Sequence, residues 1–133
     1  MQTRKKLLLV DDEPLVRRSM QKTLRRAGFV VETAGNCTEG LEVFQAAHAS
    51  DAPFDLAVLD IGMPGFEGTE KPEAGLELLS RLLADVSDLP VVMLTAYDEV
   101  NKAKEAVTRG ARAYCVKGRE QGLVDLIKEI LDL

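Results

Sequence analysis

Five short apolar runs alternate along the chain with longer segments whose apolar residues recur every three or four positions. The runs occupy residues 7–10, 29–31, 56–59, 91–94 and 113–116. Wholly apolar runs of this length are typical of strands that are buried on both faces of a parallel sheet. The pattern therefore predicts five such strands.

A helix is expected after each of these strands. In the first, Pro14 suits the opening turn and Gly28 suits the end. Asn36 or Thr38 is suited to capping the second helix. The remaining helices are expected over residues 75–83, 99–109 and 123–131. Fivefold alternation of strand and helix predicts an α/β fold, a doubly wound parallel sheet with helices on both faces.

The amino-acid composition argues against several classes of function. The 133 residues, taken as 1–133, suit one domain, and we expect no output domain within them. A net charge of −5 disfavours direct binding to nucleic acid. No apolar run reaches the length of a membrane span and no secretion signal opens the chain, so we expect no membrane contact and a cytoplasmic location. Two cysteines and one histidine argue against a disulfide framework, a zinc site and a Ser-His-Asp triad.

Polar residues follow four of the predicted strands where each strand ends. They are Asp11 and Asp12, Asp60, Thr95 and Lys117. In open α/β sheets, ligands bind outside the carboxyl ends of the strands. One acid after a strand is often only a turn former or a helix cap. Four strand ends that carry this set together favour a functional site.

The chemistry of this set points to a phosphoryl group. Two carboxylates about 4 Å apart repel by roughly 4 kcal/mol at an effective dielectric near 20. A divalent cation relieves that repulsion, and Mg²⁺ suits ligands that are all oxygen. The lysine would add a positive charge and the threonine a hydrogen-bond donor, while one carboxylate serves as nucleophile.

Four segments carry a family resemblance: LLLVDDEP at 7–14, LAVLDIGMP at 56–64, VVMLTA at 91–96 and AYCVK at 113–117. They resemble the receiver domain of two-component response regulators, of the chemotaxis-regulator type, over about residues 5–132. The resemblance implies a flavodoxin-like (βα)5 sheet with strand order 2-1-3-4-5.

The resemblance also implies roles for individual residues. Asp60 would be the phosphoacceptor, and it would hold Mg²⁺ together with Asp11, Asp12 and the backbone carbonyl of Gly62. Lys117 would pair with a phosphoryl oxygen.

Further positions are implied for switching and for access. Thr95 and Tyr114 would form the switch that responds to phosphorylation. Gly62, Ala96 and Tyr97 would flank the path to the phosphoryl group.

The implied partner is a histidine kinase or a phosphotransfer protein, which would supply phosphate from a phosphohistidine. Such a domain is not an enzyme for an external substrate, because it catalyses only its own phosphorylation and dephosphorylation. The resemblance also suggests a homodimer through the face formed by the fourth helix, fifth strand and fifth helix, roughly residues 99–131.

The sequence departs from the family pattern at three places. Gly118 follows Lys117 where the family usually has proline, so the peptide bond there should be trans. Gly62 stands where a larger side chain is common. The loop over 65–75 is longer than usual, either as a tolerated surface insertion or as a flap that tunes kinase choice.

Three alternatives remain at this point. A haloacid-dehalogenase-like phosphatase also uses Mg²⁺ and an aspartyl phosphate, but it needs a second acid where Gly62 stands. A flavodoxin-like flavin binder conflicts with the acids after the first strand. A degenerate, non-phosphorylated receiver conflicts with the complete set of site residues.

Overall fold

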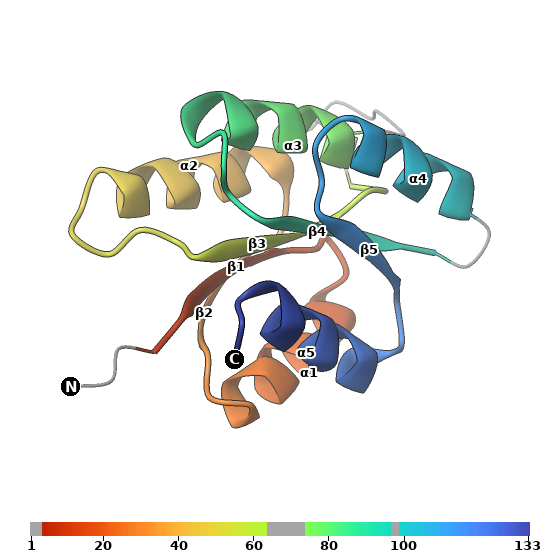
Figure 1. The fold of residues 1–133 in the computed structure, drawn as a ribbon, viewed down its shortest axis with the longest axis horizontal. Helices are drawn as coiled ribbons and strands as arrows, with labels where there is room; N and C mark the ends of the chain where they lie inside the picture. Colours follow the sequence, from red (N-terminus) through yellow and green to blue (C-terminus); the bar gives the residue numbers. More distant parts are fainter. Residues whose placement is uncertain (1–3, 64–73, 97–98) are drawn as a thin grey trace.

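The computed structural model describes residues 4–63, 74–96 and 99–133, in which strands and helices alternate along the chain (Figure 1). The strands are β1 (Lys6–Val10), β2 (Val30–Ala34), β3 (Leu56–Asp60), β4 (Val91–Thr95) and β5 (Ala113–Val116). The helices are α1 (Pro14–Arg26), α2 (Cys37–His48), α3 (Ala74–Asp85), α4 (Val100–Thr108) and α5 (Glu120–Ile130).

The five strands form one parallel sheet in the order β2-β1-β3-β4-β5, as the family resemblance implied. Helices α2, α3 and α4 cover one face, and α1 and α5 cover the other (Figure 1). Because all strands run the same way, their carboxyl ends meet along one edge of the sheet. The α/β prediction is therefore confirmed in its layers and in its strand order.

The core explains why the inner strands β1, β3 and β4 are apolar except at their ends, whereas the outer strand β2 carries Glu32 and Thr33 beyond the predicted run over 29–31. In β1, Leu8 and Val10 pack with α2 and α3, while Leu7 and Leu9 pack with α1 and α5. Every residue of β3 and β4 is buried. A strand with helices on both faces has no solvent side, so a polar residue is tolerated only at its end.

Helix ends follow local chemistry. The Asn36 side chain accepts a hydrogen bond from the Glu39 N–H at 2.8 Å, which identifies Asn36 as the cap of α2. Gly28 and Gly110 follow α1 and α4 with φ of +103° and +116°, a conformation that favours glycine. The expected helix stops at these two glycines are thus confirmed.

One position on α1 differs from its pattern. Leu15 belongs to the helical run of apolar residues, yet 78% of it is exposed. Met20 and Leu24, further along the helix, are the buried residues of α1. The first turn of the helix therefore leaves a large apolar side chain in solvent beside the carboxyl edge of β1.

Candidate functional site

The carboxyl edge of the sheet brings the expected polar residues together. Asp60 and Thr95 are the last residues of β3 and β4, and Asp11 directly follows β1. These three are the buried polar or charged residues among the parts of the chain that the structure describes, with exposed fractions of 0 to 4%. Burial of two carboxylates is costly unless they are paired, so this edge needs a positive charge close to both acids.

Lys117 supplies the pairing charge. Its ammonium group donates to Asp60 Oδ2 at 2.8 Å and lies 3.3 Å from Asp11 Oδ2. It also donates to Glu13 Oε1 at 2.7 Å. Burial alone would lower the pKa of Lys117, but the hydrogen bonds to Asp60 and Glu13 and the charges of Asp60 and Asp11 outweigh it and raise that pKa. Lys117 is therefore firmly protonated.

Both buried carboxyl groups resist ionisation. Burial raises the pKa of Asp60 to about 7, although the hydrogen bond and charge of Lys117 work in the opposite direction. Burial likewise raises the pKa of Asp11, opposed by the Glu13 N–H that donates to Asp11 Oδ1 at 2.9 Å. One ammonium is thus too little positive charge for the acids around it.

The carboxylates fit a hard divalent cation. Oxygen atoms of Asp11, Asp12, Glu13 and Asp60 all lie within 4.8 Å of one another. Asp11 Oδ2 is buried and accepts no hydrogen bond from the described residues, although the Lys117 ammonium is only 3.3 Å away. A buried oxygen with an unused lone pair inside an all-oxygen set is the kind of site that suits Mg²⁺. For Gly62, the N–H donates to Asp60 Oδ1 at 3.2 Å, and a role for its carbonyl stays a prediction.

Thr95 lies beside this group with its hydroxyl turned away. Thr95 Oγ1 donates to the carbonyl oxygen of Ala96 at 3.1 Å. A hydroxyl has a single proton to donate, so it must rotate to serve a group on Asp60. The backbone N–H of Lys117 donates to the carbonyl of Thr95 at 2.9 Å, which ties the ends of β4 and β5 together.

The remaining predicted residues are found at the edges of the site. Ala96 and Gly62 are exposed, as positions on an access path should be. Tyr114 is half-buried in β5, level with Met93, and packs against the core under α3 and α4. Tyr97 lies outside the described residues.

Two departures from the family pattern have structural outcomes. No peptide bond among the described residues is cis, in agreement with the trans bond expected between Lys117 and Gly118. Gly118 has φ of +92°, which favours glycine there. Of the long loop over 65–75, only Ala74 and Gly75 lie within the described residues, so its proposed role as a flap stays a prediction.

Sequence reasoning missed three contacts. Glu13 pairs with Lys117, from which it is separated by 104 positions. Arg17 Nη1 donates to the carbonyl of Asp11 at 2.6 Å. Gly75 touches the backbone of Asp60. The adjacency of Glu13 to the acidic pair was a usable signal for the first, whereas the other two depend on how helices seat against the sheet.

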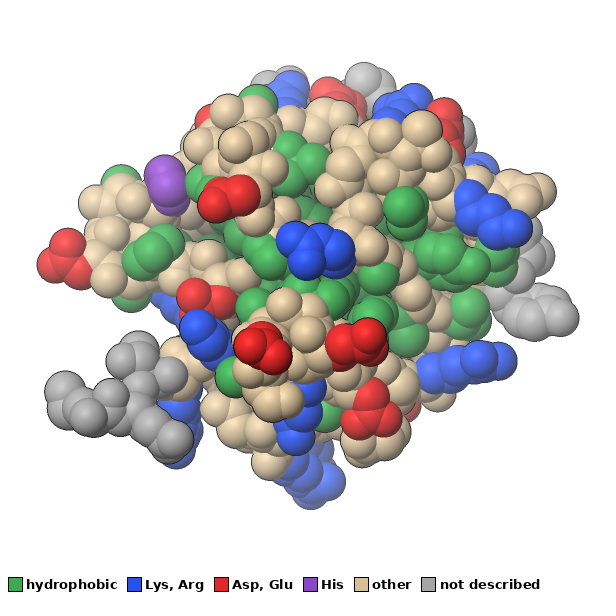
Figure 2. Space-filling model, in the orientation of Figure 1, with side chains coloured by type: hydrophobic (Ala, Val, Ile, Leu, Met, Phe, Trp, Pro, Cys, Tyr) green, Lys and Arg blue, Asp and Glu red, His purple; other side chains and the backbone are tan. Residues whose placement is uncertain are grey.

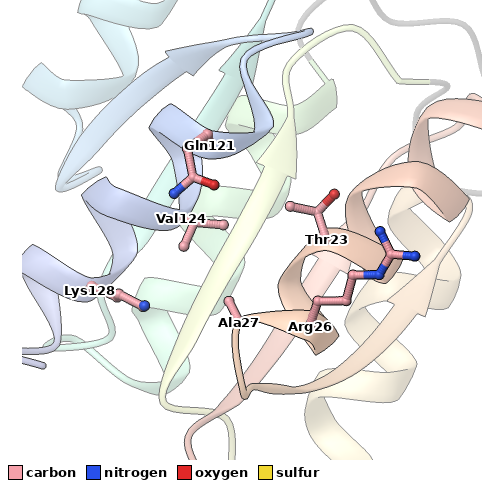
Figure 3. Close-up of a pocket in the computed structure, with 6 residues that line it drawn as sticks. All are labelled: Thr23, Arg26, Ala27, Gln121, Val124 and Lys128. Carbon is pink, nitrogen blue, oxygen red and sulfur yellow. The ribbon is translucent and has the colours of Figure 1, made fainter.

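Two further features lie away from this edge. A groove of about 360 Å³ runs between α1 and α5, and Figure 3 shows side chains of both helices pointing into it. It is lined by Thr23, Arg26, Ala27, Gln121, Val124 and Lys128, so none of the acidic residues of the carboxyl edge lies in this groove. The chain's one histidine, His48, is exposed at the end of α2, and its ring stacks on that of Phe44. Histidine is coloured purple in Figure 2, where it lies on the surface.

Comparison with known proteins agrees with this geometry. The family described as the response regulator receiver domain matches residues 7–128. The response regulator MprA of Mycobacterium ulcerans is 37% identical over 112 residues, which cover 84% of this chain and 43% of MprA. The chain spans less than half the length of the curated relatives it matches.

Comparison with solved structures points to the same family. A CheY-like receiver domain protein from Methanospirillum hungatei superimposes with a TM-score of 0.81 at 30% identity, covering 98% of this chain and 95% of that one. The response regulator TrrA of Thermotoga maritima, in complex with Mg²⁺ and BeF, gives a TM-score of 0.77 at 30% identity, covering 95% of this chain and 98% of TrrA.

A parallel sheet with an acidic, lysine-paired carboxyl edge and these relatives define one class of protein, a phosphoacceptor module of two-component signalling. The chain belongs to the response regulator receiver domain family. The phosphatase and flavin-binding alternatives are not favoured. In the described residues, no helix combines the length and the hydropathy that a membrane crossing requires.

Proposed function

We propose that Asp60 accepts the phosphoryl group, that Asp11, Asp12 and Asp60 hold Mg²⁺ with the carbonyl of Gly62, and that Thr95 and Lys117 bind the phosphoryl oxygens. One observation carries this assignment. Asp60 is a buried carboxylate at a strand end, held by Lys117 at 2.8 Å, beside an Asp11 oxygen to which none of the described residues donates a hydrogen bond. Mg²⁺, when bound, neutralises negative charge on the acids and on the incoming group.

The transfer step uses groups that are already in place. An Asp60 oxygen attacks the phosphorus of a phosphohistidine, and the new P–O bond forms as the P–N bond breaks. The imidazole nitrogen keeps the electron pair and takes up a proton. Lys117 already contacts the attacking carboxylate, so its ammonium stabilises the negative charge that builds up on the phosphoryl oxygens. In this reading the chain catalyses only its own phosphorylation and dephosphorylation.

Phosphorylation would change the contacts at the end of β4. In the structure the Thr95 hydroxyl donates to Ala96, whereas a phosphoryl group on Asp60 offers it a charged acceptor. A contact present in only one of two states is what shifts their populations. Tyr114 on the neighbouring strand would report the change to α4, β5 and α5. A homodimer through that face is part of the proposal, and light scattering with and without a phosphoryl mimic tests it.

The partner is proposed to be a histidine kinase or a phosphotransfer protein. The exposed Leu15 lies two residues after Glu13, whose carboxylate contacts Lys117, so an apolar side chain of the partner could cover it. Leu15→Ser should then slow phosphotransfer from the kinase while leaving phosphorylation by acetyl phosphate unchanged. Equal slowing with both donors would contradict this docking position. The relatives are longer than this chain, and any effector activity would belong to segments beyond the receiver domain.

Phosphorylation itself is tested by intact mass after incubation with acetyl phosphate and Mg²⁺. The protein should gain one phosphoryl group, and Asp60→Asn should gain none. Asp51→Asn, at an exposed acid in the turn after α2, is the matched control and should behave like the parent protein. No addition to the parent protein, or undiminished addition to Asp60→Asn, would refute the assignment and would favour a degenerate receiver or another acceptor.

A further inference from the structure

Gly75, in the first turn of α3, lies against the backbone of the phosphoacceptor. A Cβ atom at this position would be 2.2 Å from the carbonyl oxygen of Asp60 and 2.7 Å from the Cα of Ile61. An ordinary contact at such a carbon begins at 3.4 Å, so a side chain would force the two backbones apart by about 1.2 Å. The neighbouring atoms are backbone, which cannot rotate away as a flexible side chain can.

The same backbone is held from two sides. The Ile61 N–H donates to the carbonyl of Leu94 in β4 at 3.1 Å, and the Gly75 N–H donates to the carbonyl of Ile61 at 3.1 Å. The next residue, Gly62, donates its N–H to Asp60 Oδ1 at 3.2 Å. The position of α3 is therefore connected, through two hydrogen bonds and one close contact, to the carboxylate of Asp60.

We propose that Gly75 is a positioning residue for Asp60. Its missing side chain lets the first turn of α3 rest on the Asp60–Ile61 peptide, and this contact sets where the carboxylate stands relative to Lys117 and Asp11. Glycine within a helix costs about 1 kcal/mol relative to alanine, so its presence here calls for a steric reason. Active groups must be held within about 0.5 Å of their productive place, and a misplacement of about 1 Å can cost about a hundredfold in rate.

The inference rests on the proposed function of Asp60, and Gly75→Ala tests it with three readouts. The Gly62 amide resonance reports the hydrogen bond to Asp60 without any reaction, and its position should change in Gly75→Ala. Titration with Mg²⁺ should show a dissociation constant about tenfold higher, the size of effect seen when support of a metal ligand is disturbed. The phosphorylation rate at saturating Mg²⁺ and acetyl phosphate should fall roughly 10- to 100-fold.

Gly110→Ala is the matched control. Its Cβ would lie 2.8 Å from Leu83 Cδ1, and its φ of +116° is strained for alanine, so this variant also loses stability. Gly110 lies before β5, at the opposite edge of the sheet from Asp60. In this variant the Gly62 amide resonance should keep its position. The Mg²⁺ dissociation constant and the phosphorylation rate should stay within about twofold of those of the parent protein. Equal losses in the two variants would overturn the proposal, because general destabilisation would then explain them.

A second variant, which combines Gly75→Ala with Cys37→Ala, addresses the case in which Gly75→Ala alone does not fold. The thiol of the fully buried Cys37 donates to the carbonyl of Ala74 at 3.5 Å, so Cys37→Ala gives the start of α3 more room. Gly75→Ala in that background should fold and should show the same three changes. Unchanged readouts in a folded Gly75→Ala protein, or loss of the fold in both backgrounds, would overturn the positioning role. A parent protein that binds Mg²⁺ but is never phosphorylated would instead count against the proposed function, since the amide and Mg²⁺ readouts do not need it.

Discussion

Replacing Asp60 by asparagine should stabilise the metal-free protein at alkaline pH. Asp60 is 4% exposed, and burial raises its pKa from an ordinary 3.8 to about 7 even with Lys117 beside it. The ionised carboxylate is therefore disfavoured in the folded state. Asparagine has nearly the same shape and carries no charge, so the variant loses this cost.

The size and sign of the effect follow from that pKa. Below about pH 4, Asp60 is protonated in the folded and the unfolded chain and contributes nothing. Between about pH 4 and 7 the unfolded chain releases the proton first, so the free energy of unfolding falls as pH rises. Above pH 7 the cost is complete. At 1.36 kcal/mol for each pH unit, its upper bound is about 4 kcal/mol. Because Asp60→Asn also removes the ionised partner of Lys117, we expect a gain at pH 8 that is smaller than this bound.

Urea unfolding followed by circular dichroism at pH 4, 6 and 8, with EDTA present, measures this gain. The difference between Asp60→Asn and the parent protein should be small at pH 4 and should grow with pH. Asp51→Asn, at an exposed acid, should give no such trend. A difference that is independent of pH, or a less stable variant at pH 8, would refute the argument that burial dominates at Asp60.

Three other outcomes are expected. Mg²⁺ at about one hundred times its dissociation constant should raise the free energy of unfolding by about 2.7 kcal/mol at pH 8, and Asp11→Asn should lose that gain; equal gains in both proteins would place the metal elsewhere. Lys117→Met leaves the buried acids without their counter-charge and should cost about 3 kcal/mol at pH 8 and less at pH 5, as urea unfolding would show; a cost independent of pH would contradict the pairing with Asp60. Asn36→Ala removes the acceptor of the Glu39 N–H and should cost about 1 kcal/mol, whereas Asn101→Ala, on the exposed surface of α4, should cost little; equal costs would argue against capping.

The sequence alone predicted the strands best where helices cover both faces of the strand. Strands β3 and β4 are buried along their whole length and stand out as uninterrupted apolar runs up to their final polar residue, whereas the outer strand β2 includes Glu32 and alternates between exposed and buried positions. The glycines after α1 and α4 mark true helix ends. The site residues were equally visible, because Asp60 and Thr95 are polar at the ends of otherwise apolar strands. Parallel strands bring their carboxyl ends to one edge whatever the details of packing.

Contacts between elements needed the tertiary structure. Leu15 continues the apolar pattern of α1 but is exposed, whereas its neighbour Val16 packs against the core. The strand order was available only through the family resemblance, since periodicity does not say which strands are neighbours. The pairing of Glu13 with Lys117 depends on that order and on where α1 begins.

What the sequence determined by itself is the set of strands, the helices between them and the chemical groups at the strand ends. These follow from local rules of burial and from the chain order. What only the tertiary structure decided is how those groups act on one another: the raised pKa of Asp60, the unused oxygen of Asp11 and the close approach of Gly75. Each of these depends on distances of a few ångströms between segments far apart in the chain, and such distances are set by the packing of whole helices on the sheet.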